Sequence, residues 1–186
     1  MSLLVRYKRP GGFLQLVRLI ESFGNEKKEK FLHILEQEDP SWAGAVESKL
    51  LTVDGILSWK DEALHDIMRK VHTKNMAAVL HGVNESTRER LLGILSDTEK
   101  RQLMDEYETM NPTKSEISAS MVIMIEETRE MIVKKYLKLD DIDPKLVIRD
   151  DIEEELASGA LVLRRQKKSR PEDDVPIRGD RSATNS

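Results

Sequence analysis

The sequence contains no cysteine among its 186 residues. This absence excludes disulfide bonds, thiolate metal sites and cysteine nucleophiles. Aromatic residues make up only 4% of the chain, although 39% of all residues are hydrophobic and Leu, Ile, Met and Ala are plentiful. A β-sandwich or barrel would need more β-branched and aromatic residues, so the composition predicts an all-α protein.

The sequence also lacks any apolar run that approaches a membrane span, and its first residues lack the apolar core of a signal peptide. We therefore expect a cytoplasmic protein with no direct membrane insertion. Charged residues make up 34% of the chain and leave a formal net charge of −4. This balance argues against nucleic acid as the main partner of the whole chain.

Catalytic and metal-binding patterns are missing as well. No serine or aspartate is combined with a histidine in a recognisable catalytic arrangement, and there is no glycine-rich phosphate loop. His65 and His72 are seven residues apart, whereas two metal-binding histidines on one helix are typically four apart and need a third ligand. We predict that the chain is not an enzyme and binds neither a cofactor nor a metal.

The N-terminal region, residues 1–50, carries apolar residues at helical spacing in three short segments separated by tight turns. Asp39-Pro40 is a cap followed by proline, which predicts the start of the third helix. Such a trio of helices is typical of an armadillo-like unit, which buries its faces by stacking. Residues 51–55 (LTVDG) interrupt the helical pattern and predict a hinge.

Residues 56–148 predict a helical bundle with one long C-terminal helix, which starts after the capping residue Thr113 and runs to about Leu139. Residues 149–186 predict a mostly disordered charged tail, in which residues 150–157 could form one or two acidic helical turns, because too few apolar residues are available there for burial. A basic run at 164–168 could contact nucleic acid, but the acidic residues just beyond it favour a solvated tail.

The stretch from Leu80 to Lys114 predicts two helices, the second opened by a capping box of Ser96 and Glu99. One face of this second helix is apolar: Leu103, Met104, Tyr107 and Met110. Asp105 points the opposite way, and Glu106 lies on the flank between the two faces. A helix anchored by one face and charged on the other predicts a protein-binding surface.

A set of positions recurs in the order and spacing of a known family: Gly11-Gly12, Asp39, Asp54, Ile56-Leu57, Arg69-Lys70-Val71, Lys74, Leu80, Gly82, Arg88-Glu89-Arg90, Leu92, Ser96, Asp105-Glu106 and Pro112. Together they resemble the C-terminal region of the flagellar motor switch protein FliG family. The resemblance implies a rotor component with an armadillo-like subdomain and a six-helix bundle. One charged ridge of that bundle would meet the charged cytoplasmic loop of the stator.

Carried over residue by residue, the resemblance implies a stator-binding set: Asp105, Glu106, Lys114, His81 and Lys100. Two basic positions of the family fall here on His81 and Thr98, and Lys100 is the nearest basic substitute for Thr98. The apolar hinge motif of the family implies a hinge here at Leu50, Leu51, Thr52, Val53 and Gly55, without the aromatic residues of the family.

Two functional hypotheses follow. The first is a rotor and switch component at the cytoplasmic face of the inner membrane, which binds the stator loop, other switch-complex proteins and neighbouring rotor subunits. The alternative is a non-motor helical adaptor that reuses the fold, because the sequence lacks counterparts of the N-terminal and middle parts of the family. A third hypothesis, nucleic-acid binding, depends on residues 164–170.

Overall fold

The structure of the protein is a computed structural model that describes residues 3–159. All regular elements within that range are helical, which confirms the predicted all-α class. In chain order, with one 3-10 turn (η1), they are α1 (Gly12–Glu21), α2 (Asn25–Glu38), α3 (Pro40–Glu47), α4 (Val53–Leu57), α5 (Asp61–Lys70), α6 (Thr73–Gly82), α7 (Glu85–Ile94), α8 (Asp97–Thr109), α9 (Lys114–Val133), α10 (Leu139–Ile142), η1 (Pro144–Leu146) and α11 (Ile152–Ala157).

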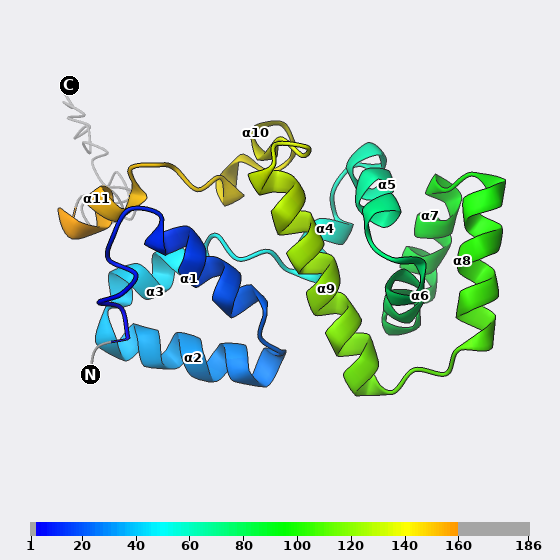
Figure 1. Cartoon of the computed structure of the whole chain (residues 1–186), viewed down its shortest axis with the longest axis horizontal. Helices are drawn as coiled ribbons and strands as arrows, with labels where there is room; N and C mark the ends of the chain where they lie inside the picture. The colour runs from blue at the N-terminus through cyan, green and yellow to red at the C-terminus, as the bar shows by residue number, and fades with distance from the viewer. Residues whose placement is uncertain (1–2, 160–186) are drawn as a thin grey trace, which may run out of the picture.

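The helices α1, α2 and α3 form an N-terminal unit with its own apolar core (Figure 1). The side chains of Phe13, Leu16 and Ile20 recur at helical spacing along α1 and are buried. The ring of Phe13 lies 5.7 Å from that of Trp42 in α3. The Asp39 side chain accepts a hydrogen bond from the Trp42 N–H at 3.2 Å, so the predicted cap of α3 is confirmed.

The second core lies in the bundle, where α6 packs against both α8 and α9. Five consecutive residues of α6, Met76 to Leu80, are buried, because neighbouring helices cover it on several sides. Gly82 ends α6 where it approaches α9 closely. A Cβ atom added to this glycine would lie 2.5 Å from Cγ2 of Ile117 and 2.6 Å from Cε of Met121. None of the described helices combines the length and apolarity needed to cross a bilayer.

The long helix α9 ends at Val133 rather than near the predicted Leu139. Lys135 adopts a left-handed backbone conformation with a φ angle of 61°. The amides of Tyr136 and Lys135 donate to the carbonyls of Met131 and Ile132 at 2.8 and 2.9 Å, which is the Schellman arrangement that closes a helix. The sequence does not predict this end, because the residue at the left-handed position is usually glycine and is here a lysine.

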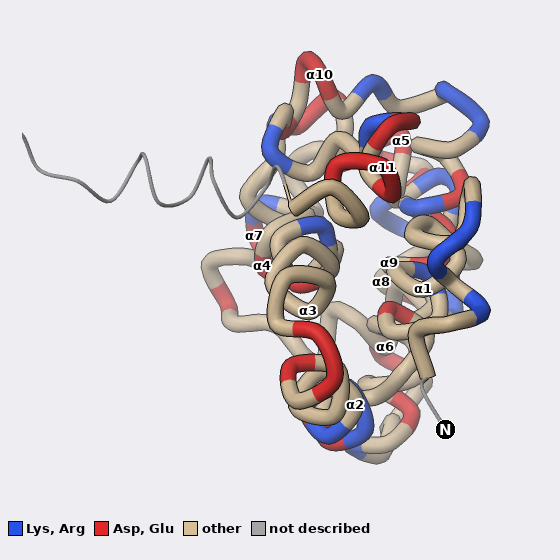
Figure 2. Tube along the Cα trace, turned by 90° about the vertical axis from the view of Figure 1, so that its left-hand side faces the viewer, with Lys and Arg blue, Asp and Glu red and all other residues tan. Residues whose placement is uncertain are grey.

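The chain then crosses back to the N-terminal unit and ends its described part in α11 (Figure 1). Ile152 and Leu156 enter the N-terminal core, and a carboxylate oxygen of Glu153 accepts the N–H of Phe13 at 3.0 Å. Figure 2 views this side and shows the acidic residues of α11 in red above α3. The helix α11 lies where the sequence predicts one or two acidic helical turns, and it packs on the N-terminal unit because its helical spacing places Ile152 and Leu156 on one face. Residues 160–186, including the basic run, lie outside the described residues.

Candidate protein-interaction surface

The helix α8 is fixed to the bundle by its first turn and by its apolar face. The Ser96 hydroxyl accepts the N–H of Glu99 at 3.4 Å, and a Glu99 carboxylate oxygen accepts the N–H of Ser96 at 3.0 Å. This geometry confirms the predicted capping box. Leu103 is buried, and Tyr107 and Met110 are partly buried against the bundle core. One face of α8 is thus anchored by packing and its start by hydrogen bonds.

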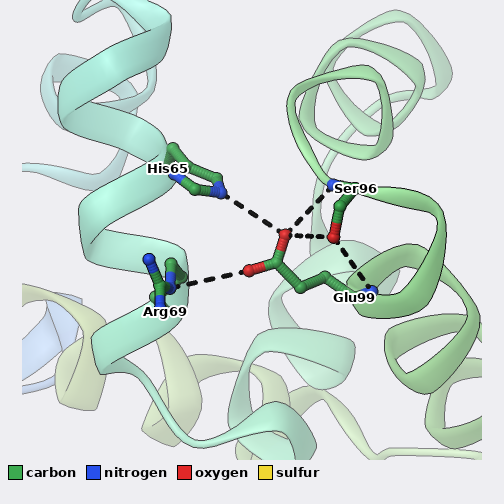
Figure 3. A network of polar contacts seen from close by, with 4 residues as sticks. All are labelled: His65, Arg69, Ser96 and Glu99. Carbon is green, nitrogen blue, oxygen red and sulfur yellow. Dashed lines mark hydrogen bonds and ion pairs between the residues drawn. The ribbon is translucent and has the colours of Figure 1, made fainter.

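The carboxylate of Glu99 also ties α8 to α5 (Figure 3). Nε2 of His65 lies 3.4 Å from one carboxylate oxygen, and Nε of Arg69 lies 3.6 Å from the other. The hydrogen bond from the Ser96 side chain, then that from the Ser96 backbone and the contacts with His65, lower the pKa of Glu99 to about 2. His65 therefore contacts a carboxylate, and the described residues contain no cluster of histidine and acidic side chains able to hold a metal.

Four of the five residues predicted to bind the stator have exposed side chains: Lys100, Asp105, Glu106 and Lys114. We call Asp105, Glu106 and Lys114 the α8–α9 ridge. Within residues 3–159, none of these four side chains forms an ion pair. Their charges remain solvated and open to an oppositely charged partner. Lys100 is five residues from Asp105, about 140° around the helix axis. It therefore points away from the face that carries Asp105.

His81 lies behind the ridge rather than on it. Its ring stacks on that of Tyr107, with the ring centroids 4.1 Å apart and the planes 18° apart. Its Nε2 is 3.0 Å from the Tyr107 carbonyl oxygen, and because a carbonyl only accepts, Nε2 must carry the hydrogen. Arg88 donates to the Tyr107 hydroxyl at 2.8 Å. The position implied for stator contact is therefore half-buried and holds the last turn of α8 in place.

The Arg88–Tyr107 contact was not predicted from the sequence. Arg88 lies in α7 and Tyr107 in α8, 19 residues later, so only the packing of these two helices brings them together. The one local signal was Tyr107 itself, whose hydroxyl must find a polar partner when its ring packs on a core.

The structure divides the five predicted hinge residues into two groups. Leu50 and Leu51 lie outside any regular element, whereas Thr52, Val53 and Gly55 belong to the capped start of α4. The side chain of Leu51 is fully buried, and its N–H donates to a carboxylate oxygen of Glu21 at 2.7 Å. The Thr52 hydroxyl accepts the N–H of Gly55 at 3.0 Å and caps α4. The interruption that the sequence predicts is therefore short, and both of its ends are bonded.

Two helical units with separate apolar cores, one of which presents unpaired charges on an anchored helix, define an all-helical domain. Residues 33–141, more than half of the chain, match the family described as the FliG C-terminal domain. The chain belongs to this family.

Relatives described as flagellar motor switch protein FliG occur in several bacteria. The flagellar motor switch protein FliG of Thermotoga maritima is 22% identical over 148 residues, which are 80% of this chain and 42% of that protein. The FliG protein of Borreliella burgdorferi is 25% identical over 136 residues, 73% of this chain and 37% of the relative. The Aquifex aeolicus protein is 23% identical over 124 residues, 66% of this chain and 38% of the relative. The chain therefore spans only about two fifths of the length of these relatives.

Proposed function

We propose that the chain is a component of a flagellar motor switch and that its α8–α9 ridge binds the charged cytoplasmic loop of the stator. Family membership and the names of the relatives support the motor-switch class. The observation that carries the stator role is that Asp105 and Glu106 are exposed and unpaired on a helix whose other face is anchored. On this proposal the chain works at the cytoplasmic face of the inner membrane, with the N-terminal unit against neighbouring rotor subunits and other switch proteins.

Exposed carboxylates suit a contact that must form and break repeatedly. They contribute little to a static complex, but they steer an oppositely charged segment towards the surface and fix its register. Lys114 supplies the opposite sign at the start of α9, so a partner with both signs of charge could be aligned as well as attracted. Because the charges are solvated, the contact should weaken as ionic strength rises.

Reversing both carboxylates tests this role. The double variant Asp105→Lys/Glu106→Lys, introduced in the source cells, should abolish or strongly reduce swimming while the circular dichroism of the purified protein stays unchanged. The matched control is Asp140→Lys/Asp141→Lys on α10, which makes the same change in net charge at two adjacent exposed sites of the bundle outside the ridge. The control should swim normally. Normal swimming of the ridge variant would overturn the stator role.

The alternative function is a non-motor helical adaptor with the same fold. It is favoured by His81, which packs beneath Tyr107, and by Thr98, which carries no charge where the family has a base. Co-purification from the native cells distinguishes the two functions. Recovery of stator or switch proteins supports the motor role. An adaptor would recover other partners, and its source would lack flagella or would also encode a full-length switch protein.

A further inference from the structure

A buried ion pair joins the two helical units. Arg129 of α9 and Glu21 of α1 are 2% and 1% exposed, although each belongs to a different unit. Nε and Nη2 of the arginine donate to the two carboxylate oxygens at 3.0 and 2.6 Å. Nη2 also donates to the carbonyl of Lys49 at 2.7 Å, and Glu21 accepts the N–H of Leu51 at 2.7 Å. The pair therefore bonds α1, α9 and the segment that connects the units.

The burial of these charges points to a role in geometry rather than in stability. A buried ion pair loses the hydration of both groups, and well-packed apolar side chains of similar size are often at least as stabilising. The pair instead fixes the orientation of α1 relative to α9, because a bidentate guanidinium–carboxylate contact has one favourable arrangement. Rotation of the N-terminal unit against the bundle would break these four hydrogen bonds at a site where both side chains are almost fully buried.

Contacts at the rim of the joint are weaker or more distant. Arg18 of α1 pairs with Glu130 of α9 at 2.9 Å, but both side chains are about a third to a half exposed. The segment after α9 returns to the N-terminal unit, where α11 packs into the core and forms a second connection between the two units (Figure 1). The Glu21–Arg129 contact is thus the buried polar contact at the centre of the joint.

The opposite side of the joint is open. A hollow of about 1060 Å³ lies between the start of α2, the helix α4, the turn before α7 and the middle of α9. Lys27 and Lys28 form its rim on the N-terminal unit, and Val53 and Met121 line it on the bundle. The two units are not in close contact there, so packing on this side does not prevent them from moving closer together.

We propose that the Glu21–Arg129 pair is an interlock that holds the α8–α9 ridge in one orientation relative to the N-terminal unit. The segment at residues 51–55 acts as a hinge only after this pair is broken. On this proposal the pair restrains the hinge that the sequence predicts. This inference concerns the chain itself, and it stands whether or not the ridge binds a stator.

Distance measurements between the units test the interlock. Because the chain has no cysteine, Glu36→Cys on α2 and Arg101→Cys on α8 place single spin labels at two exposed sites. With the pair intact, we expect one narrow distance distribution. The variant Glu21→Leu/Arg129→Met removes both charges without leaving either one unpaired, and it should broaden or split the distribution while helix content is kept. The control Arg18→Met breaks only the rim pair and should leave the distribution narrow.

A narrow distribution in the double charge-removal variant would overturn the proposal, because apolar packing alone would then fix the joint. A second measurement needs no change at Glu21 or Arg129. In the unsubstituted chain, hydrogen exchange at the Leu51 amide should be as slow as at the core amides of α6, because its exposure requires the interlock to open. Exchange of that amide at the rate of an exposed loop would count equally against the interlock.

Discussion

The joint and the ridge use the same chemical groups in opposite ways. At the joint, Glu21 and Arg129 are removed from water, and each is bonded to the other and to the backbone. On the ridge, Asp105 and Glu106 remain solvated and form no ion pair within the described residues. A buried charge is stable only when it is paired, whereas an exposed charge is stabilised by water and remains free to bind a partner. Removing a charge should therefore lower the stability of the fold at the joint, whereas at the ridge it should weaken the binding of a partner.

The largest effect is expected at the joint. Either Arg129→Met or Glu21→Gln alone leaves a buried group without its partner, and the free energy of unfolding should fall by about 3–5 kcal/mol. The double variant Glu21→Leu/Arg129→Met should recover part of this loss, because no charge is then stranded, although the Leu51 amide and the Lys49 carbonyl lose their partners. Urea denaturation followed by circular dichroism measures all three variants. Single variants that lost less than about 1 kcal/mol would show that water reaches the pair.

The second effect concerns α11, which anchors the return of the chain. Leu156→Ala should lower the stability of the N-terminal unit by about 2–3 kcal/mol, because the buried side chain leaves a cavity. Trp42 lies in this unit and Trp59 in the bundle, so a Trp59→Phe background reports the N-terminal unit by fluorescence. The control Glu154→Ala alters an exposed residue of the same helix and should have little effect. Equal effects of the two substitutions would argue against the packing of α11.

Features set by neighbouring residues could be predicted from the sequence, and features set by distant residues could not. The all-α class, the capping box at Ser96 and the caps at Asp39 and Thr113 depend on residues close in the sequence, and all were predicted correctly. Glu21 and Arg129 are separated by 108 positions, so no local pattern connects them. A signal did exist: Glu21 lies four residues after the buried Val17, and Arg129 four residues after the buried Ile125. A charge within an apolar stripe predicts a buried partner.

The same reasoning explains the early end of α9 and the packing of α11. The end of α9 depends on one left-handed residue, Lys135, where sequence rules expect glycine. The packing of α11 depends on a core built by residues more than a hundred positions earlier, so the sequence predicted its helical turns but not the surface that they contact. The exposure of Asp105 and Glu106 was easier to predict, because helical spacing relative to Leu103 and Tyr107 fixes which face they occupy.

Glu99 is intermediate between the joint and the ridge, because it lies at the surface and yet has several partners. Its pKa in the folded chain is about 2, below the ordinary value of 4.5, so folding favours the carboxylate. The stability that it contributes is therefore present above pH 4.5 and is lost as the pH falls towards 2. Carboxyl NMR titration should give a midpoint near 2, and Glu99→Gln should flatten the fall of stability in this pH range. A midpoint near 4.5 would show that the Ser96 and His65 contacts are not maintained in solution.

The smallest effect on stability is expected for the ridge itself. The variant Asp105→Lys/Glu106→Lys should change the free energy of unfolding by less than about 0.5 kcal/mol, because neither side chain is buried or paired within the described residues. A small loss is expected from the new lysine at position 105, which would follow Arg101 by one helical turn and repel it. The same urea denaturation measures this change. A loss above about 1 kcal/mol would mean that the carboxylates support the fold, and a motility defect in that variant could then no longer be assigned to a lost contact. Nearly unchanged stability together with lost swimming would show that the ridge charges serve binding, in contrast to the buried charges of the joint, which support the fold.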